Sequence, residues 1–246
     1  MITLPSQGLS IVIPVYNEAE NIMPLLAEIQ AILQQQTNYE IIMVDDGSTD
    51  DTYSAVLSAQ KKIYQVKIIR HQYNYGQSAS IVSGVRMASL SWIITLDGDG
   101  QNDPRDIKIL LDMLQQQSNQ EKPILIVGHR QKRHDRWLRR LSSRIANHIR
   151  HALLRDHCLD TGCSLKLFKR DDFLKLPHFD HIHRFLPALF IRANGEVLNV
   201  PVSHRPRLYG QSKYGVMNRL WIGIIDLLGV MWLLRRPCNP EIIKHV

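Results

Sequence analysis

The chain of 246 residues has few cysteines and no long uninterrupted apolar run. Its three cysteines, Cys158, Cys163 and Cys238, form no CxxC pair, which argues against a disulfide framework or a structural zinc site. The most apolar stretch, Leu220–Leu234, has 15 residues and includes Asp226, whereas a spanning helix needs about 20 apolar residues. Glycine (13) and proline (11) are too few for a fibrous or low-complexity chain.

The first residues lack the basic and apolar regions of a secretory signal, so none is expected. Hydrophobic residues make up 44% and charged residues 22%, which is ordinary for a folded soluble protein. The length favours one α/β domain with extensions.

Acidic residues are almost absent from one basic segment. Between His129 and Arg155 there are nine Lys and Arg residues against one acid, Asp135, while the whole chain carries a net charge of +7. A cluster this one-sided indicates an anionic partner: phosphate, a membrane surface or nucleic acid. Residues 134–153 within it predict a basic amphipathic helix, and Leu220–Leu234 predicts an apolar one. Both are typical of helices that lie at a membrane surface, although a core helix or an oligomer contact is the alternative for the second.

Short apolar runs alternate with helical patterns. Strands are predicted at 9–13, 40–44, 66–69, 92–96, 124–127, 163–169 and 196–203, and helices at 18–36, 50–62, 77–89, 104–117 and 182–193. Asp50 and Asp103 are candidate N-caps. Continuous apolar runs that alternate with helices predict a mostly parallel sheet with helices on both faces.

Polar clusters follow three of these strands. They are Pro14–Glu18, Asp45–Asp50 and Asp97–Gln101. Ligands of such sheets bind beyond the carboxyl ends of the strands, so the clusters are expected to meet at one crevice. Asp97 and Asp99 could share one hard cation, with Gln101 adding an amide oxygen. Asp45 and Asp46 could bind ribose or base hydroxyls, or form a helix N-cap with a tight turn; no Gly-rich dinucleotide loop or P-loop is present.

Six motifs carry a resemblance to one enzyme family, and the first four occur in the order found in that family. They are IPVYNE at 13–18, VDDGS at 44–48, NYGQ at 74–77, DGDGQ at 97–101, DTGCSLK at 160–166 and RPRLYGQSK at 205–213. Over roughly residues 8–235 the chain resembles family 2 glycosyltransferases of GT-A fold. The last two motifs resemble the polyprenyl-phosphate sugar synthases, the dolichol-phosphate mannosyltransferase-like branch. The resemblance divides the chain into a GT-A domain, 1–214, and an interfacial helix with a tail, 215–246.

The resemblance implies an inverting enzyme that moves a hexose-type sugar from a UDP- or GDP-sugar to undecaprenyl or dolichyl phosphate. The product would serve cell-envelope glycoconjugates, and the enzyme would sit peripherally on the cytoplasmic face of the membrane. The implied nucleotide-sugar site comprises Pro14, Tyr16, Glu18, Val44, Asp46, Asp97, Gly98, Asp99, Gln101, Arg130, Arg207 and Lys213. Four of these are implied to act in catalysis: Asp99, Arg130, Arg207 and Lys213.

The resemblance also implies a metal site and an acceptor site. Mg²⁺ or Mn²⁺ would be held by Asp97, Asp99 and Gln101, and the acceptor phosphate by Arg139 and Ser143. A phosphate monoester is largely ionised at neutral pH because its second pKa is about 6. A dedicated general base is therefore unnecessary, and electrostatics with positioning can carry most of the rate.

Two other functions are weighed against this one. A related glycosyltransferase with a polysaccharide or protein acceptor is disfavoured, because a neutral hydroxyl would need a base and no second cluster of cations. A nucleic-acid-binding protein would interleave aromatic residues with the basic segment, but only Trp137 lies there. Nucleic acid is therefore not an expected partner, and a homo-oligomer remains open.

Overall fold

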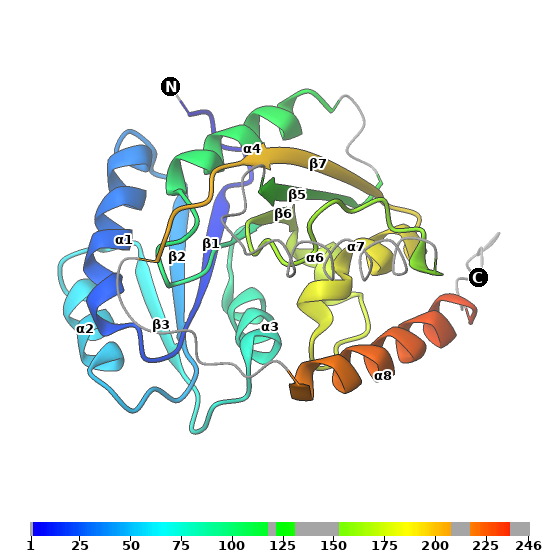
Figure 1. The fold of residues 1–246 in the computed structure, drawn as a ribbon. Helices are drawn as coiled ribbons and strands as arrows, with labels where there is room; N and C mark the ends of the chain where they lie inside the picture. The colour runs from blue at the N-terminus through cyan, green and yellow to red at the C-terminus, as the bar shows by residue number, and fades with distance from the viewer. Residues whose placement is uncertain (1, 118–121, 131–152, 208–216, 237–246) are drawn as a thin grey trace, which may run out of the picture.

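The computed structural model describes residues 2–117, 122–130, 153–207 and 217–236 (Figure 1). Residues 134–152 of the predicted basic helix 134–153, with Arg139 and Ser143, lie outside the described residues, as does Lys213.

One seven-stranded sheet organises the fold, in the order β3-β2-β1-β4-β6-β5-β7. The strands are β1 (Leu9–Val15), β2 (Tyr39–Asp45), β3 (Val66–Arg70), β4 (Trp92–Thr95), β5 (Ile124–Arg130), β6 (Lys166–Lys169) and β7 (Glu196–Val202). All neighbouring strands are parallel except β6, which runs antiparallel to β4 and β5. The predicted mostly parallel α/β sheet is confirmed, and the reversal at β6 is a feature that the sequence pattern did not reveal.

Helices cover both faces of the sheet (Figure 1). One face carries α1 (Ala19–Leu33), α2 (Thr52–Gln60) and α4 (Ile107–Gln115), and the other carries α3 (Gln77–Met87), α6 (Arg170–Leu174) and α7 (Ile182–Arg192). Strand β1 shows the reason, since Ile11 and Ile13 pack on the first side and Val12 on the second. All three side chains are fully buried, which explains the continuous apolar run.

The predicted caps are partly corrected. Asp103 caps the 3₁₀ turn Pro104–Asp106 before α4, and its carboxylate accepts a hydrogen bond from the Arg105 amide. The residue that caps α2 is Asp51 rather than Asp50, although an oxygen of Asp50 accepts from the Thr52 amide at 3.0 Å. Helix α6 was not predicted, because five residues are too few to show a helical period.

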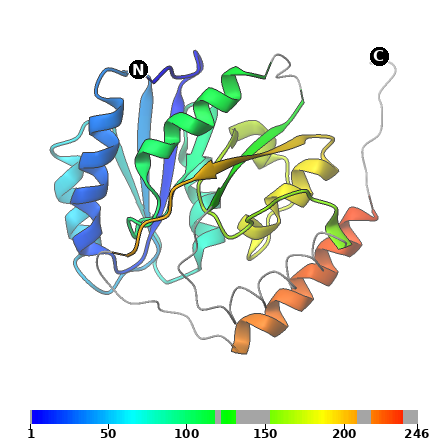
Figure 2. The same cartoon turned by 45° about the horizontal axis from the view of Figure 1, so that its top comes forward.

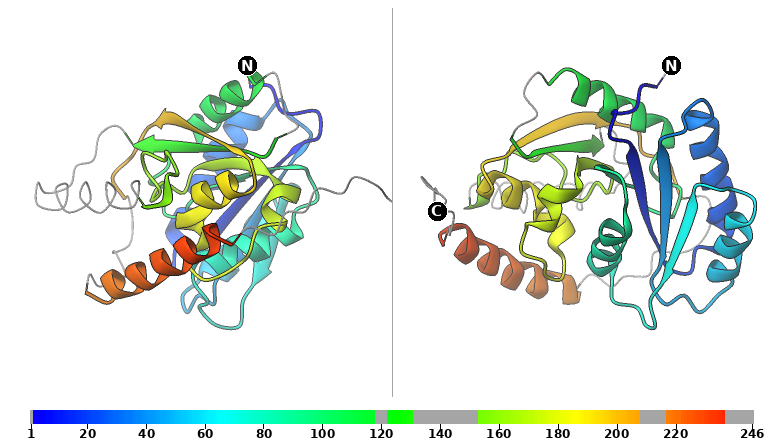
Figure 3. Two further views of the ribbon diagram at one scale, coloured as in Figure 1. Left: turned by 90° about the vertical axis from the view of Figure 1, so that its right-hand side faces the viewer. Right: turned by 180° about the vertical axis from the view of Figure 1, so that it is seen from behind.

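Helix α8 (Met217–Leu234) runs along the outside of the molecule beside α7 (Figures 2 and 3). Val230 is buried against α7, and an Asp226 oxygen lies 2.9 Å from His181 Nδ1 at the start of α7. The opposite side exposes apolar residues: Ile224, Ile225, Leu228 and Trp232. Among the described helices, none combines the length and apolar character needed to cross a bilayer.

Candidate active site

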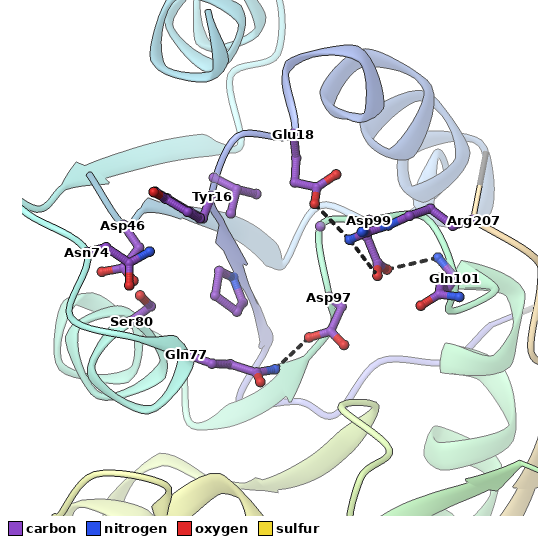
Figure 4. A pocket seen from close by; sticks show the side chains of 13 residues that line it. Tyr16, Glu18, Asp46, Asn74, Gln77, Ser80, Asp97, Asp99, Gln101 and Arg207 are labelled. Atoms are coloured by element: carbon purple, nitrogen blue, oxygen red, sulfur yellow. Dashed lines mark hydrogen bonds and ion pairs between the residues drawn. The ribbon is translucent and has the colours of Figure 1, made fainter. Parts of the chain in front are cut away.

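A cleft of about 500 Å³ opens at the carboxyl ends of the strands (Figure 4). Its walls come from the segments after β1, β2, β3, β4 and β7. The lining residues are Pro14, Val15, Tyr16, Glu18, Asp46, Asn74, Gln77, Ser80, Asp97, Gly98, Asp99, Gln101 and Arg207. The structure thus brings together the three polar clusters that the sequence placed at strand ends.

The loop after β4 lies directly against the end of β1. A Cβ added to Gly98 would stand 2.4 Å from Val15 Cγ1 and 3.1 Å from the Pro14 carbonyl oxygen. Only glycine allows this close approach. The close packing brings Asp97 and Asp99 into the lining of the cleft beside the end of β1.

The carboxylate of Asp46 is held by the loop after β3. Its Oδ1 accepts from the Tyr75 amide at 3.0 Å and lies 2.7 Å from His71 Nδ1, while its Oδ2 accepts from the Gly76 amide at 2.7 Å. These contacts fix the orientation of Asp46 in the wall of the cleft. A carboxylate oxygen has two lone pairs, so Oδ2 has capacity for one further donor, such as a ribose or base group.

Two acids form the centre of the cleft. Asp97 Oδ1 accepts from the Gln77 amide nitrogen at 2.7 Å, and Asp99 Oδ1 accepts from the Gln101 backbone N–H at 3.1 Å. Burial and the neighbouring charge of Asp99 raise the pKa of Asp97 to about 6. The two carboxylates therefore repel each other, and a shared divalent cation would relieve that repulsion.

The donor set suits Mg²⁺ or Mn²⁺, since these ions prefer oxygen and often bind through one or two carboxylates plus substrate phosphates. In the part of the chain that the structure describes, no three His, Cys, Asp or Glu residues are grouped to hold a metal by themselves. Asp97 and Asp99 thus fit a cation that is shared with a phosphate-bearing ligand.

Arg207 bridges two walls of the cleft. Its Nη2 lies 2.8 Å from Glu18 Oε1 and 3.2 Å from Asp99 Oδ2, so a guanidinium charge already stands over the acids (Figure 4). The preceding backbone is anchored by Arg205, whose N–H donates to the Gln101 carbonyl at 2.9 Å. The Arg205 guanidinium pairs with Asp103 and with Glu28 on α1, both at 2.7 Å.

Among the described residues of the predicted donor site, Val44 and Arg130 do not line the cleft. Val44 is fully buried in the core beside Val12 and α3, so its side chain does not reach a ligand. Its place in the nucleotide-sugar site stays a prediction. Arg130 donates from Nε and Nη2 to the carboxylate of Asp160 at 2.7 and 2.9 Å, and its role toward the donor stays a prediction.

Sequence reasoning missed four lining residues: Val15, Asn74, Gln77 and Ser80. Asn74 and Gln77 belong to the NYGQ motif, to which no role was assigned. The position of this motif could have predicted that it lines the cleft. It follows β3, whose carboxyl end lies at the same edge of the sheet as those of β1, β2 and β4.

The fold and the cleft are typical of α/β proteins that bind phosphate-bearing ligands. In this chain the acids Asp97 and Asp99, which follow β4, lie in that cleft. Solved structures of glucosyl-3-phosphoglycerate synthase from Mycobacterium tuberculosis share this fold. One, in complex with UDP, has a TM-score of 0.69 and 15% identity over 93% of this chain and 80% of that one. Another contains Mn²⁺, UDP and glucosyl-3-phosphoglycerate, with a TM-score of 0.67 and 16% identity over 96% of this chain and 82% of that one.

Sequence relatives narrow the class to a family. Residues 10–176 match the family described as glycosyl transferase family 2, and the chain belongs to this family. It is 33% identical over 243 residues to a dodecaprenyl-phosphate galacturonate synthase of Rhizobium johnstonii, covering 96% of this chain and 70% of the relative. It is 34% identical to an undecaprenyl-phosphate 4-deoxy-4-formamido-L-arabinose transferase of Sodalis glossinidius, covering 85% of this chain and 63% of that protein.

Proposed function

We propose that the protein transfers a sugar from a nucleotide-diphosphate sugar to a polyprenyl phosphate. The observation that carries this proposal is the cleft in which Asp97 and Asp99 face Arg207. Acids that can share a cation, with a guanidinium beside them, suit a diphosphate leaving group. The relatives whose names describe polyprenyl-phosphate sugar transfer support the choice of acceptor.

The donor would extend across the cleft from the nucleoside to the sugar. Tyr16 and Asp46 would contact the nucleoside, and Arg207 would hold the diphosphate through its paired N–H donors. A cation held by Asp97 and Asp99 would neutralise charge on the departing diphosphate. We propose Mg²⁺ or Mn²⁺ for this place.

The acceptor phosphate needs no proton removed before it reacts. One of its oxygens attacks the anomeric carbon, the bond from that carbon to the diphosphate oxygen breaks, and the nucleoside diphosphate leaves with the electron pair. Attack from the side opposite the leaving group inverts the anomeric centre. We propose that cations of the segment 129–155, with Arg139 and Ser143, bind the acceptor phosphate, and that Lys213 and Arg130 act on the donor.

We also propose that the protein works on the cytoplasmic face of a membrane, held by residues 215–246. The support is the exposed face of α8, where Ile225, Leu228 and Trp232 are 66%, 59% and 61% exposed. An apolar face this exposed, on a helix with Arg235 and Arg236 at its end, suits the boundary between lipid headgroups and acyl chains.

A donor screen tests the function. Purified protein is incubated with Mn²⁺ or Mg²⁺, a short-chain polyprenyl phosphate and a panel of UDP- and GDP-sugars, and glycolipid is measured by mass spectrometry. A lipid-linked sugar that forms only with metal is the expected result. Release of nucleotide without glycolipid would overturn the lipid acceptor and favour a polysaccharide or protein acceptor. Failure to bind any nucleotide sugar would overturn the whole proposal.

A further inference from the structure

A second cavity of about 120 Å³ lies next to the donor cleft. It is lined by Gln77, Ile81, Thr95, Gly162, Cys163, Ser164, Lys166, His183, Arg184 and Leu186. Gln77 lines both spaces, and its amide donates to Asp97 at 2.7 Å. Figure 4 places Gln77 and Asp97 on the side of the cleft away from Glu18 and Arg207.

The lining of this cavity is cationic. Lys166 and Arg184 contribute two positive side chains, and no carboxylate belongs to the described lining. Two acids, Asp97 and Asp160, act electrostatically on Lys166, but neither belongs to the described lining. An anionic group that enters the cavity would therefore meet attraction from these two cations.

Lys166 is buried and has N–H donors available for a ligand. Lys166 is the first residue of β6, and it is only 3% exposed. It donates to the Cys163 carbonyl, and within the described ranges this is its one hydrogen bond. An ammonium group has three N–H donors, so two remain for a ligand. Burial lowers the pKa of Lys166, and an anion beside it would favour the charged form.

His183 adds a neutral donor. The Ser78 hydroxyl oxygen accepts from the His183 backbone N–H at 3.4 Å and lies 2.7 Å from His183 Nδ1. These two contacts with Ser78 hold the His183 ring in the wall of the cavity. Burial lowers the pKa of His183 well below its usual value, so the ring stays neutral and carries one N–H that can donate.

We infer that this cavity receives the sugar of the donor and selects a hexuronate, whose carboxylate is bound by Lys166 with Arg184 and His183. The inference rests on the proposed function. With the diphosphate at Asp97 and Asp99, the sugar ring would lie beside Gln77, and its far end would reach the cavity. A water molecule occupies about 30 Å³ in the liquid, so 120 Å³ accommodates a group of several heavy atoms such as a carboxylate.

The test compares binding of charged and neutral donors. Calorimetry with Mn²⁺ and no acceptor gives the affinities of UDP-glucuronate and UDP-galacturonate against UDP-glucose and UDP-galactose, with the GDP-sugars as a second set. We expect the wild-type protein to prefer the uronates by about 100-fold, the range found for a buried charge that is left unpaired. This measurement needs no variant, and equal affinities would overturn the inference.

Variants assign the preference to the cavity. Lys166→Met keeps the side-chain volume and removes the charge, so the ratio of uronate to hexose affinity should collapse; Lys166→Arg should restore part of it. The matched control is Lys169→Met on the same strand, whose ammonium lies 5.4 Å from the Trp92 ring centre and outside the cavity. That control should keep the wild-type ratio.

The outcomes separate this inference from the proposed function. Binding of nucleotide sugars without preference for uronates, or a preference that survives Lys166→Met, overturns the selectivity and leaves the transfer reaction standing. Failure to bind any nucleotide sugar overturns the proposed function and this inference with it.

Discussion

Replacing Arg205 by methionine tests how the segment after β7 is held over the cleft. Arg205 pairs with Asp103 and Glu28, both at 2.7 Å, and it stands two residues before Arg207. Loss of these pairs should destabilise the fold and release Arg207 from Asp99. Both effects can be measured, and only the first depends on the ionisation of Asp103.

The size of the stability effect follows from Asp103. Burial alone would raise its pKa, but hydrogen bonds from Arg105 and Arg205 outweigh burial and lower the pKa from 3.8 to about 2. At about 1.4 kcal/mol per pH unit, this corresponds to about 2 kcal/mol for both partners together. The Arg105 side chain is 74% exposed and screened by solvent, so we assign about 1 kcal/mol to Arg205.

The sign of the pH dependence is fixed by the direction of the shift. The folded pKa of Asp103 lies below its unfolded value, so its stabilisation is complete above about pH 5 and is lost as the pH falls toward 2. Arg205→Met should therefore lose about 1 kcal/mol of unfolding free energy at pH 7, and about half of that at pH 2.5. Urea unfolding followed by tryptophan fluorescence measures both values.

The catalytic effect needs its own control. Freeing Arg207 should raise the KM for the donor by about 10-fold, the cost of one charge-assisted hydrogen bond. Arg105→Met removes the other cation from Asp103 but leaves the pair between Arg205 and Glu28 in place, so it should leave that KM unchanged. An equal stability loss at both pH values, or an equal rise of KM in the control, would refute this reasoning.

Three further predictions concern the acids, the glycine between them and α8. Asp99→Asn should lower metal-dependent turnover at least about 1,000-fold, whereas Asp112→Asn, at an exposed position on α4, should not. Glycolipid assays measure both rates, and comparable rates would contradict the role of Asp99. Gly98→Ala should destabilise by about 1–3 kcal/mol, because its Cβ would meet Val15 at 2.4 Å; an unchanged urea midpoint would be contrary evidence. Trp232→Ser should weaken co-sedimentation with anionic vesicles by about 10-fold, and Tyr64→Ser, which is 95% exposed away from α8, should not.

Much of the fold was predictable because it is written in local patterns. The apolar runs that form β1 and β2 are almost entirely buried on both faces, so their composition predicted parallel strands. The motif around Asp97 was readable for the same reason, since the loops after parallel strands emerge at one edge of the sheet. Strand β6 was harder, because its direction depends on pairing with β4 and β5 and leaves no trace in its own residues.

The residue types of the candidate site were predictable from the sequence, but the positions of their side chains were less so. Val44 belongs to a recognisable motif, yet the pleat of β2 turns its side chain into the core. Gln77 was overlooked, because its importance lies in its contact with Asp97, 20 residues away. His183 had no assigned role, and only the packing of α7 against α3 brings it to Ser78.

The sequence by itself determined the alternation of strands and helices, the acids at the strand ends and the basic character of the chain. These features are local, since each depends on residues within one or two turns or one strand. Only the tertiary structure decided that Arg207 meets Glu18 and Asp99, which lie 189 and 108 residues away, and that Lys166 and His183 enclose a second cavity. Such contacts depend on the path of the whole chain, because they form only after the sheet and its helices have packed.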